Sequence, residues 1–179
     1  SKITTESYLV LDSKNFFIKH ISLKDWPVTE GNGMSNEILP SNKWNDFVKY
    51  ISDVLNIPIP DKFFPAHTPF IFRTSVVEEI INTWNLVNIV FKFKGGYEKV
   101  SEFNIYRFFS LEPLTVVEFY KTFWPGNAFP TTEEISQLHV NPAILMLGLH
   151  NGLYEQKPSE FQELIQFIED TIFKPVISS

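Results

Sequence analysis

Four short segments of the chain carry polar side chains whose types and spacing could support chemistry. In the first, residues 8–17, a four-residue apolar run ends beside Asp12, and Lys14 follows two residues later. A carboxylate at the tip of a buried strand can bind a divalent cation, which in turn holds two phosphate groups. Lys14 could help to neutralise a diphosphate. The alternative is a turn aspartate that bonds its own backbone, a common arrangement.

The second segment places His67 between Pro65 and Pro69, at the mouth of a predicted strand over residues 68–72. A neutral imidazole in that position could hydrogen-bond a sugar hydroxyl or a phosphate. The alternative is a loop histidine that satisfies nearby carbonyl groups.

The third segment begins a predicted helix with Ser101 and Glu102. The positive end of the helix dipole favours the ionised form of a first-turn carboxylate, and a fixed carboxylate can take a proton from an acceptor hydroxyl. Tyr106 lies four residues later on the same helical face. Helix capping alone explains the Ser-Glu pair equally well.

The fourth segment ends an apolar run, residues 144–149, at His150, which Asn151 and Gly152 follow. A histidine at a strand end is well placed to bind a metal or a phosphate. The alternative is a turn histidine, because Asn-Gly is itself a strong turn signal. The chain has no Gly-x-Ser-x-Gly, Walker or His-Glu-x-x-His motif, which argues against a serine hydrolase, a P-loop kinase or a zincin.

The composition of the chain limits its size class, its partners and its compartment. The chain has 179 residues, 44% hydrophobic and 16% aromatic, which is ample for the core of a single domain. Its net charge of −6 disfavours nucleic acid as a partner. No apolar run approaches the roughly 20 residues of a membrane span. The absence of cysteine excludes disulfides and thiolate sites and fits a cytoplasmic protein.

Hydrophobic periodicity predicts an alternation of strands and helices that should position the four segments. The predicted strands cover residues 8–11, 16–18, 68–72, 115–120 and 144–149. The predicted helices cover residues 42–55, 75–84, 101–109 and 159–173, with a short one beginning at Thr131. This order is typical of an α/β fold, a mixed sheet flanked by helices over residues 1–179.

The order of the four segments resembles a family of uncharacterised bacterial and phage proteins that are similar to GT-A type glycosyltransferases. The resemblance rests on residues 11–17, His67-Thr68-Pro69-Phe70, residues 101–106 and Gly148-Leu149-His150, and it extends from Tyr8 to about Phe173. It implies the C-terminal part of a nucleotide-diphospho-sugar transferase fold. The strands that usually bind the nucleoside are missing before Tyr8, so the chain is expected to be a fragment or a reduced descendant.

The resemblance also implies roles for individual residues. Asp12 stands in the acidic metal motif, with Lys14 where a second aspartate is usual, and His150 completes a site for a Mn or Mg ion and the diphosphate. The remaining roles are Glu102 as the base that activates a hydroxyl acceptor, and Lys14, His67 and Tyr106 in substrate binding. The implied reaction transfers a sugar from a nucleotide diphosphate donor to a carbohydrate or other hydroxyl acceptor.

The sequence also bears on oligomeric state and on an alternative function. A sheet without its first strands exposes an edge, which favours a homodimer. The competing hypothesis is a binding module without catalysis, in which aromatic rings stack on carbohydrate. Trp26 and Trp124 stand beside prolines in loop-like surroundings and are candidates for an exposed platform, whereas Trp44 and Trp84 fall on apolar helix faces and are expected in the core.

Overall fold

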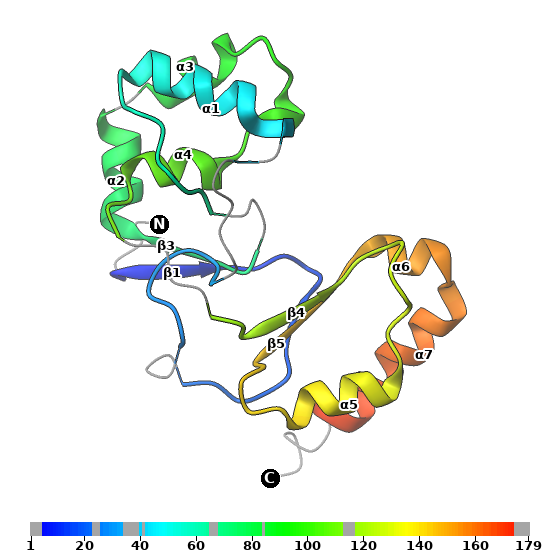
Figure 1. Cartoon of the computed structure of the whole chain (residues 1–179). Coiled ribbons are helices and arrows are strands. Elements are labelled where there is room, and N and C mark those ends of the chain that lie inside the picture. The colour runs from blue at the N-terminus through cyan, green and yellow to red at the C-terminus, as the bar shows by residue number, and fades with distance from the viewer. Residues whose placement is uncertain are drawn as a thin grey trace. The chain divides into compact units, whose positions relative to one another are not determined.

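The computed structural model describes residues 5–22, 26–33, 40, 42–64, 68–83, 85–112 and 117–173. The chain forms two compact units, which we describe separately (Figure 1). Unit 1 comprises Ser1–Val10 and Val28–Val117, and unit 2 comprises Leu11–Pro27 and Glu118–Ser179. No helix in the described ranges is long and apolar enough to cross a membrane.

Unit 1 contains a two-stranded antiparallel sheet. Strand β1 (Ser7–Val10) pairs with β3 (Phe70–Arg73), with Tyr8 opposite Phe72. β1 is half-buried along its whole length, so the prediction of a fully buried first strand is wrong. With β3 as its single partner in the described chain, β1 is an edge strand, and an edge strand does not need two covered faces.

Three helices of unit 1 begin and end close to their predicted positions. Ser101 caps α4, accepting a hydrogen bond from the backbone N–H of Asn104 as the sequence predicts. Helix α3 occupies a stretch whose pattern predicted no clear element. The helical elements of this unit are α1 (Asn42–Leu55), α2 (Thr74–Thr83), α3 (Leu86–Lys92), the 3-10 turn η2 (Tyr97–Lys99) and α4 (Glu102–Phe109).

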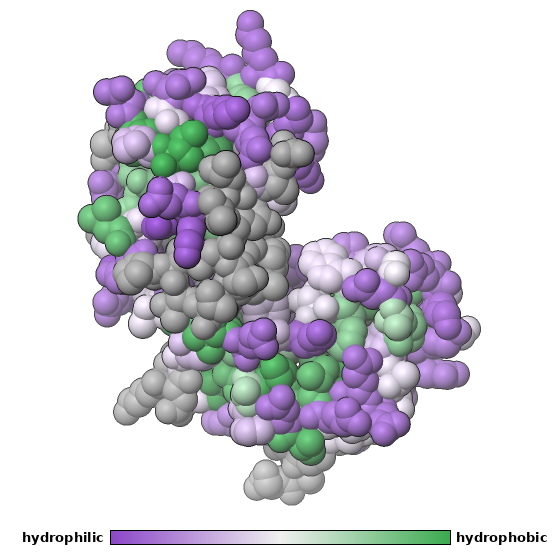
Figure 2. All heavy atoms as spheres, in the orientation of Figure 1, coloured by the Kyte–Doolittle hydropathy of each residue, from purple (hydrophilic) through white to green (hydrophobic). Residues whose placement is uncertain are grey.

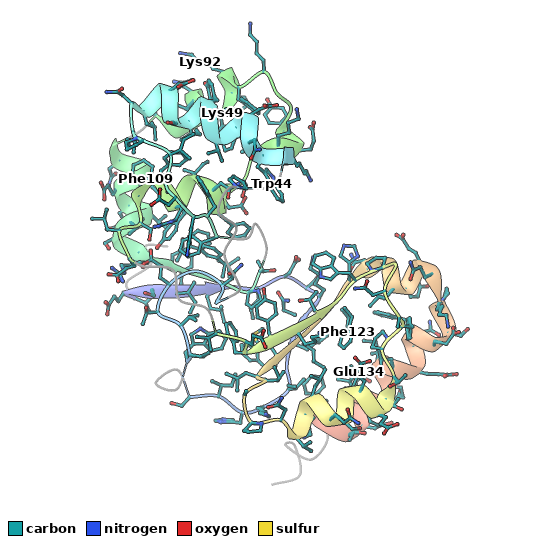
Figure 3. All side chains as sticks on the ribbon, in the orientation of Figure 1. Trp44, Lys49, Lys92, Phe109, Phe123 and Glu134 are labelled. Atoms are coloured by element: carbon teal, nitrogen blue, oxygen red, sulfur yellow. The ribbon has the colours of Figure 1, made fainter. Side chains whose placement is uncertain are left out.

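Aromatic rings dominate the core of unit 1. The ring centroids of Phe70 and Phe103 lie 4.6 Å apart. Those of Phe72 and Tyr106 lie 5.0 Å apart, at an interplanar angle of 89°. Such tilted and edge-on contacts add to the stabilisation from apolar burial. Trp44, on α1 in Figure 3, is half-buried beside Lys43, so its predicted core burial is only partial. The side chain of Trp84 lies outside the described residues.

The sequence predicts one mixed sheet, but the described strands form two separate sheets, and the mixed one is the three-stranded sheet of unit 2. The central strand β5 (Met146–Leu149) runs antiparallel to β2 (Asn15–Phe17) and parallel to β4 (Tyr120–Phe123). The helices α5 (Thr132–Val140), α6 (Asn151–Gln156) and α7 (Pro158–Ile168) flank it (Figure 1), and α7 continues into a π-helical turn, η3 (Glu169–Phe173).

The core of unit 2 lies between the sheet and these helices. Phe123 points from β4 toward them in Figure 3 and packs in one cluster with Leu149 and Leu153. The strand predicted at residues 115–120 is observed at Tyr120–Phe123, and residues 115 and 116 lie outside the described chain. Asn151 and Gly152, which suggested a turn, instead begin α6. Together the two units give a mixed α/β protein.

Candidate functional site

Three strand ends meet at one edge of the sheet in unit 2. Because β4 and β5 are parallel, their carboxyl ends lie at the same edge, with Phe123 opposite Leu149. The N–H of His150 donates to the carbonyl of Phe123 at 3.1 Å, and the N–H of Leu149 donates to the carbonyl of Lys14 at 3.0 Å. The antiparallel β2 begins at this edge, so the turn before it adjoins Trp124 and His150.

Trp124 is the centre of this group. The His150 ring lies 4.9 Å from the indole, and the Lys14 ammonium lies above the ring at 5.6 Å from its centroid. The Asp12 carboxylate pairs with Lys14 at 3.0 Å. Trp124 nevertheless keeps 39% of its surface exposed, which confirms its prediction as an exposed aromatic ring. We call Asp12, Lys14, Trp124 and His150 the Trp124 site.

The turn that carries Asp12 is fixed by its own hydrogen bonds. The backbone N–H of Asp12 donates to Asn15 Oδ1, and the N–H of Asn15 donates back to the carbonyl of Asp12, both at 2.9 Å. The side chain of Asn15 therefore closes this turn by accepting from the backbone. The Asp12 carboxylate pairs with Lys14, and the side chain of Asp12 is 46% exposed.

His150 is oriented by helix α6, which it caps. Its Nδ1 accepts the N–H of Gly152 at 3.0 Å, so the neutral ring carries its proton on Nε2 and can donate from there. Gly152 also permits the segment after Trp124 to pack closely, because a Cβ at this position would lie 2.4 Å from Cγ of Pro125. The Asn-Gly pair that predicted a turn therefore lies at the start of α6, where the missing side chain of Gly152 leaves room for Pro125.

The two residues that the resemblance implies as metal ligands make other contacts in this site. Asp12 is paired with a lysine, and Nδ1 of His150 is engaged by the helix cap. Within the described ranges, no group of three or more histidine, cysteine, aspartate or glutamate residues could hold a metal ion. The divalent cation stays a prediction, and no step proposed below depends on it.

The other predicted site residues belong to unit 1. Glu102 is exposed in the first turn of α4. Tyr106 is only 1% exposed, and its hydroxyl accepts the backbone N–H of Arg73 at 2.8 Å, so it supports the core where it stands. His67 lies outside the described residues. A base role for Glu102 and substrate-binding roles for His67 and Tyr106 stay predictions.

Unit 1 contains a buried acid, Glu30, that was not among the residues predicted from the sequence. The side chain of Glu30 is only 4% exposed, and its carboxylate lies 3.7 Å from Nη2 of Arg73, whose Nη1 pairs with Glu112 at 3.0 Å. Burial, followed by the neighbouring Glu30, raises the pKa of Tyr106. Pro and Gly around Glu30 predict only a loop, and no local pattern marks the acid as buried. We interpret this cluster as a structural support for β3 and α4.

Trp26, the second residue predicted to form an exposed aromatic platform, is not exposed. Its ring is half-buried and packs edge-on against Phe119 at 5.2 Å and Phe17 at 6.0 Å. The prediction for Trp26 is therefore wrong, because a proline neighbour marks a loop but not whether the loop folds inward.

No family model, curated protein or solved structure matches this chain.

Proposed function

We propose that unit 2 is a carbohydrate-binding module and that the Trp124 site holds a sugar ring. The observation that carries the proposal is the partly exposed indole of Trp124 among groups that can bond hydroxyls. A sugar presents an apolar face of C–H groups and a rim of hydroxyls. An exposed aromatic ring with a polar border is complementary to both.

The border of the site supplies both kinds of hydrogen-bonding group. A sugar hydroxyl donates one hydrogen bond and accepts two. Asp12 can accept from one hydroxyl, while Lys14 and Nε2 of His150 can donate to its neighbours. The Asp12–Lys14 pair keeps the two charges compensated, which suits a neutral ligand. All three groups are anchored by backbone or side-chain contacts at the sheet edge, so little ordering is needed on binding.

The test is a screen of the full chain on a panel of immobilised oligosaccharides, followed by calorimetry with the best ligand. Stacking on an aromatic side chain contributes roughly 1–3 kcal/mol in the well-measured case of nucleobases. We therefore expect Trp124→Ala to weaken binding about 5- to 140-fold, and Trp124→Phe to weaken it less. Tyr154→Ala is the matched control, because Tyr154 is an exposed aromatic residue of the same unit. Binding that survives Trp124→Ala would refute the proposal.

The second candidate is the glycosyltransferase of the resemblance, favoured by the position of Lys14 over the same indole. A nucleobase could stack on Trp124 while the Lys14 ammonium meets the diphosphate. The sugar would pass from the nucleotide diphosphate to a hydroxyl acceptor. We place either activity in the cytoplasm, in keeping with a chain that lacks cysteine.

Nucleotides separate the two candidates. A carbohydrate-binding module should bind oligosaccharides more tightly than uridine or guanosine diphosphate, and a transferase should do the reverse. Lys14→Met should abolish nucleotide binding, whereas the exposed Lys121→Met should leave it unchanged. Failure of every nucleotide diphosphate to bind, with or without manganese, would exclude the transferase.

A further inference from the structure

A second site in unit 2 lies at the other end of β2 from the Trp124 site and shares no residue with it. It is a cavity of about 560 Å³, within the range of roughly 300–1,000 Å³ that is typical of small-molecule sites. Its walls come from the end of β2 and the residues that follow it, from the last turn of α5 and from η3. The described residues that line it are Phe17, Ile18, Lys19, His20, His139, Ile172 and Phe173.

The walls of this cavity are apolar. Ile18 and Ile172 are buried, and the rings of Phe17 and Phe173 are half-buried at its border. Apolar side chains also reach the visible face of unit 2 among the hydrophilic ones in Figure 2. An apolar hollow of this size stabilises a ligand by removing its hydrocarbon surface from water.

The polar groups of the cavity are all basic or neutral. Lys19 donates one hydrogen bond to the carbonyl of Asn141, so its ammonium retains two more donors. Nδ1 of His139 donates to the carbonyl of Ile18 at 2.9 Å, and His20 is exposed at the rim. No acidic side chain is among the described residues that line the cavity. The charged side chain among these lining residues, that of Lys19, is positive, although the net charge of the whole chain is −6.

We propose that this cavity binds a small amphipathic carboxylate, with its hydrocarbon part against Phe17, Ile172 and Phe173 and its carboxylate on Lys19. The apolar walls account for the hydrocarbon part. The ammonium at their border accounts for the anionic head, because a charge-assisted hydrogen bond is about twice as strong as a neutral one. Burial lowers the pKa of Lys19, and a bound carboxylate would offset this effect by favouring the charged ammonium.

The experiment compares three ligands that share one hydrocarbon chain, namely octanoate, 1-octanol and octylammonium. Each is titrated into the isotopically labelled full chain, and backbone amide shifts are followed by NMR. We expect octanoate to shift the amides of residues 17–20, 139, 172 and 173, and to bind about tenfold more tightly than octanol, with octylammonium weakest. Trp124→Ala should not alter this binding, which separates the inference from the proposed function.

Variants at position 19 test the assigned head group. Lys19→Gln should reduce octanoate affinity to that of octanol and leave octanol unchanged, while Lys19→Arg should retain the preference for octanoate. Lys121→Gln, an exposed lysine on β4 of the same unit, is the matched control and should change nothing. Equal or tighter binding of octanol by the unaltered chain would overturn the proposal. So would the absence of shifts at the cavity, or a preference for octanoate that survives Lys19→Gln.

Discussion

The hydroxyl of Tyr106 gives the sharpest test of the core of unit 1. Tyr106→Phe keeps the ring and its contact with Phe72, and removes only the oxygen that accepts the N–H of Arg73 at 2.8 Å. The loss strands a donor and deprives the buried Glu30 of a polar neighbour. A buried group left without its partner costs about 1–3 kcal/mol, so this is the expected loss at pH 7.

The pH dependence of this difference follows from the pKa of Tyr106, which burial raises above its usual value. Below about pH 10, the phenol is protonated in both the folded and the unfolded chain, and the full stability is present. As the pH rises further, the unfolded phenol ionises while the folded one does not. The unaltered chain should therefore lose about 1.4 kcal/mol per pH unit through this residue. The ring of the Tyr106→Phe variant cannot ionise, so the deficit of this variant at pH 7 should shrink by about that amount at pH 11.

Urea unfolding followed by circular dichroism at pH 7 and pH 11 measures both effects, and amide hydrogen exchange at pH 7 assigns the loss to β3 and α4. Tyr97→Phe is the matched control, because Tyr97 belongs to the same unit and is exposed. A deficit at pH 7 no larger than that of Tyr97→Phe would refute the role given to the hydroxyl. A deficit that stays constant up to pH 11 would refute the argument from the pKa.

Two further predictions concern packing and helix ends. Leu153→Ala empties a fully buried position in unit 2 (0% exposed) and should lower the free energy of unfolding by about 2–5 kcal/mol. The control, Val140→Ala at a position that is 75% exposed, should change the free energy of unfolding by less than about 0.5 kcal/mol. Similar melting temperatures for the two variants would contradict the assigned core. Ser101→Ala and Thr131→Ala each remove a side-chain oxygen that caps a helix, and each should cost about 0.5–2 kcal/mol in urea unfolding. Ser159→Ala, at an exposed position within the first turn of α7 and not at its N-cap, is their control, and equal effects at all three positions would argue against the caps.

Elements with local signals are predictable from the amino-acid sequence. Helix α1 follows from the apolar spacing of residues 42–55, and the starts of α4 and α5 follow from Ser101 and Thr131, whose side chains bond the first turn of their own helices. Strand β5 follows from an apolar run. Side chains three or four positions apart meet on a helix whatever the rest of the chain does, so periodicity and caps predict these elements directly.

The pairing of the strands and the contacts between polar groups depend on the folded unit as a whole. Strands β1 and β2 are separated by one short turn, yet they join different sheets, and β2 takes its partner from residues 146–148 at the far end of the sequence. That pairing, which no local pattern encodes, brings Lys14 and Trp124 together. Trp26 and Trp124 both precede a proline, yet only Trp124 is exposed. Glu30 is buried beside Arg73 and Tyr106, which lie far from it in the sequence. Contacts between distant segments depend on the packing of the whole unit, because the sequence of one segment does not specify which other segment it will contact.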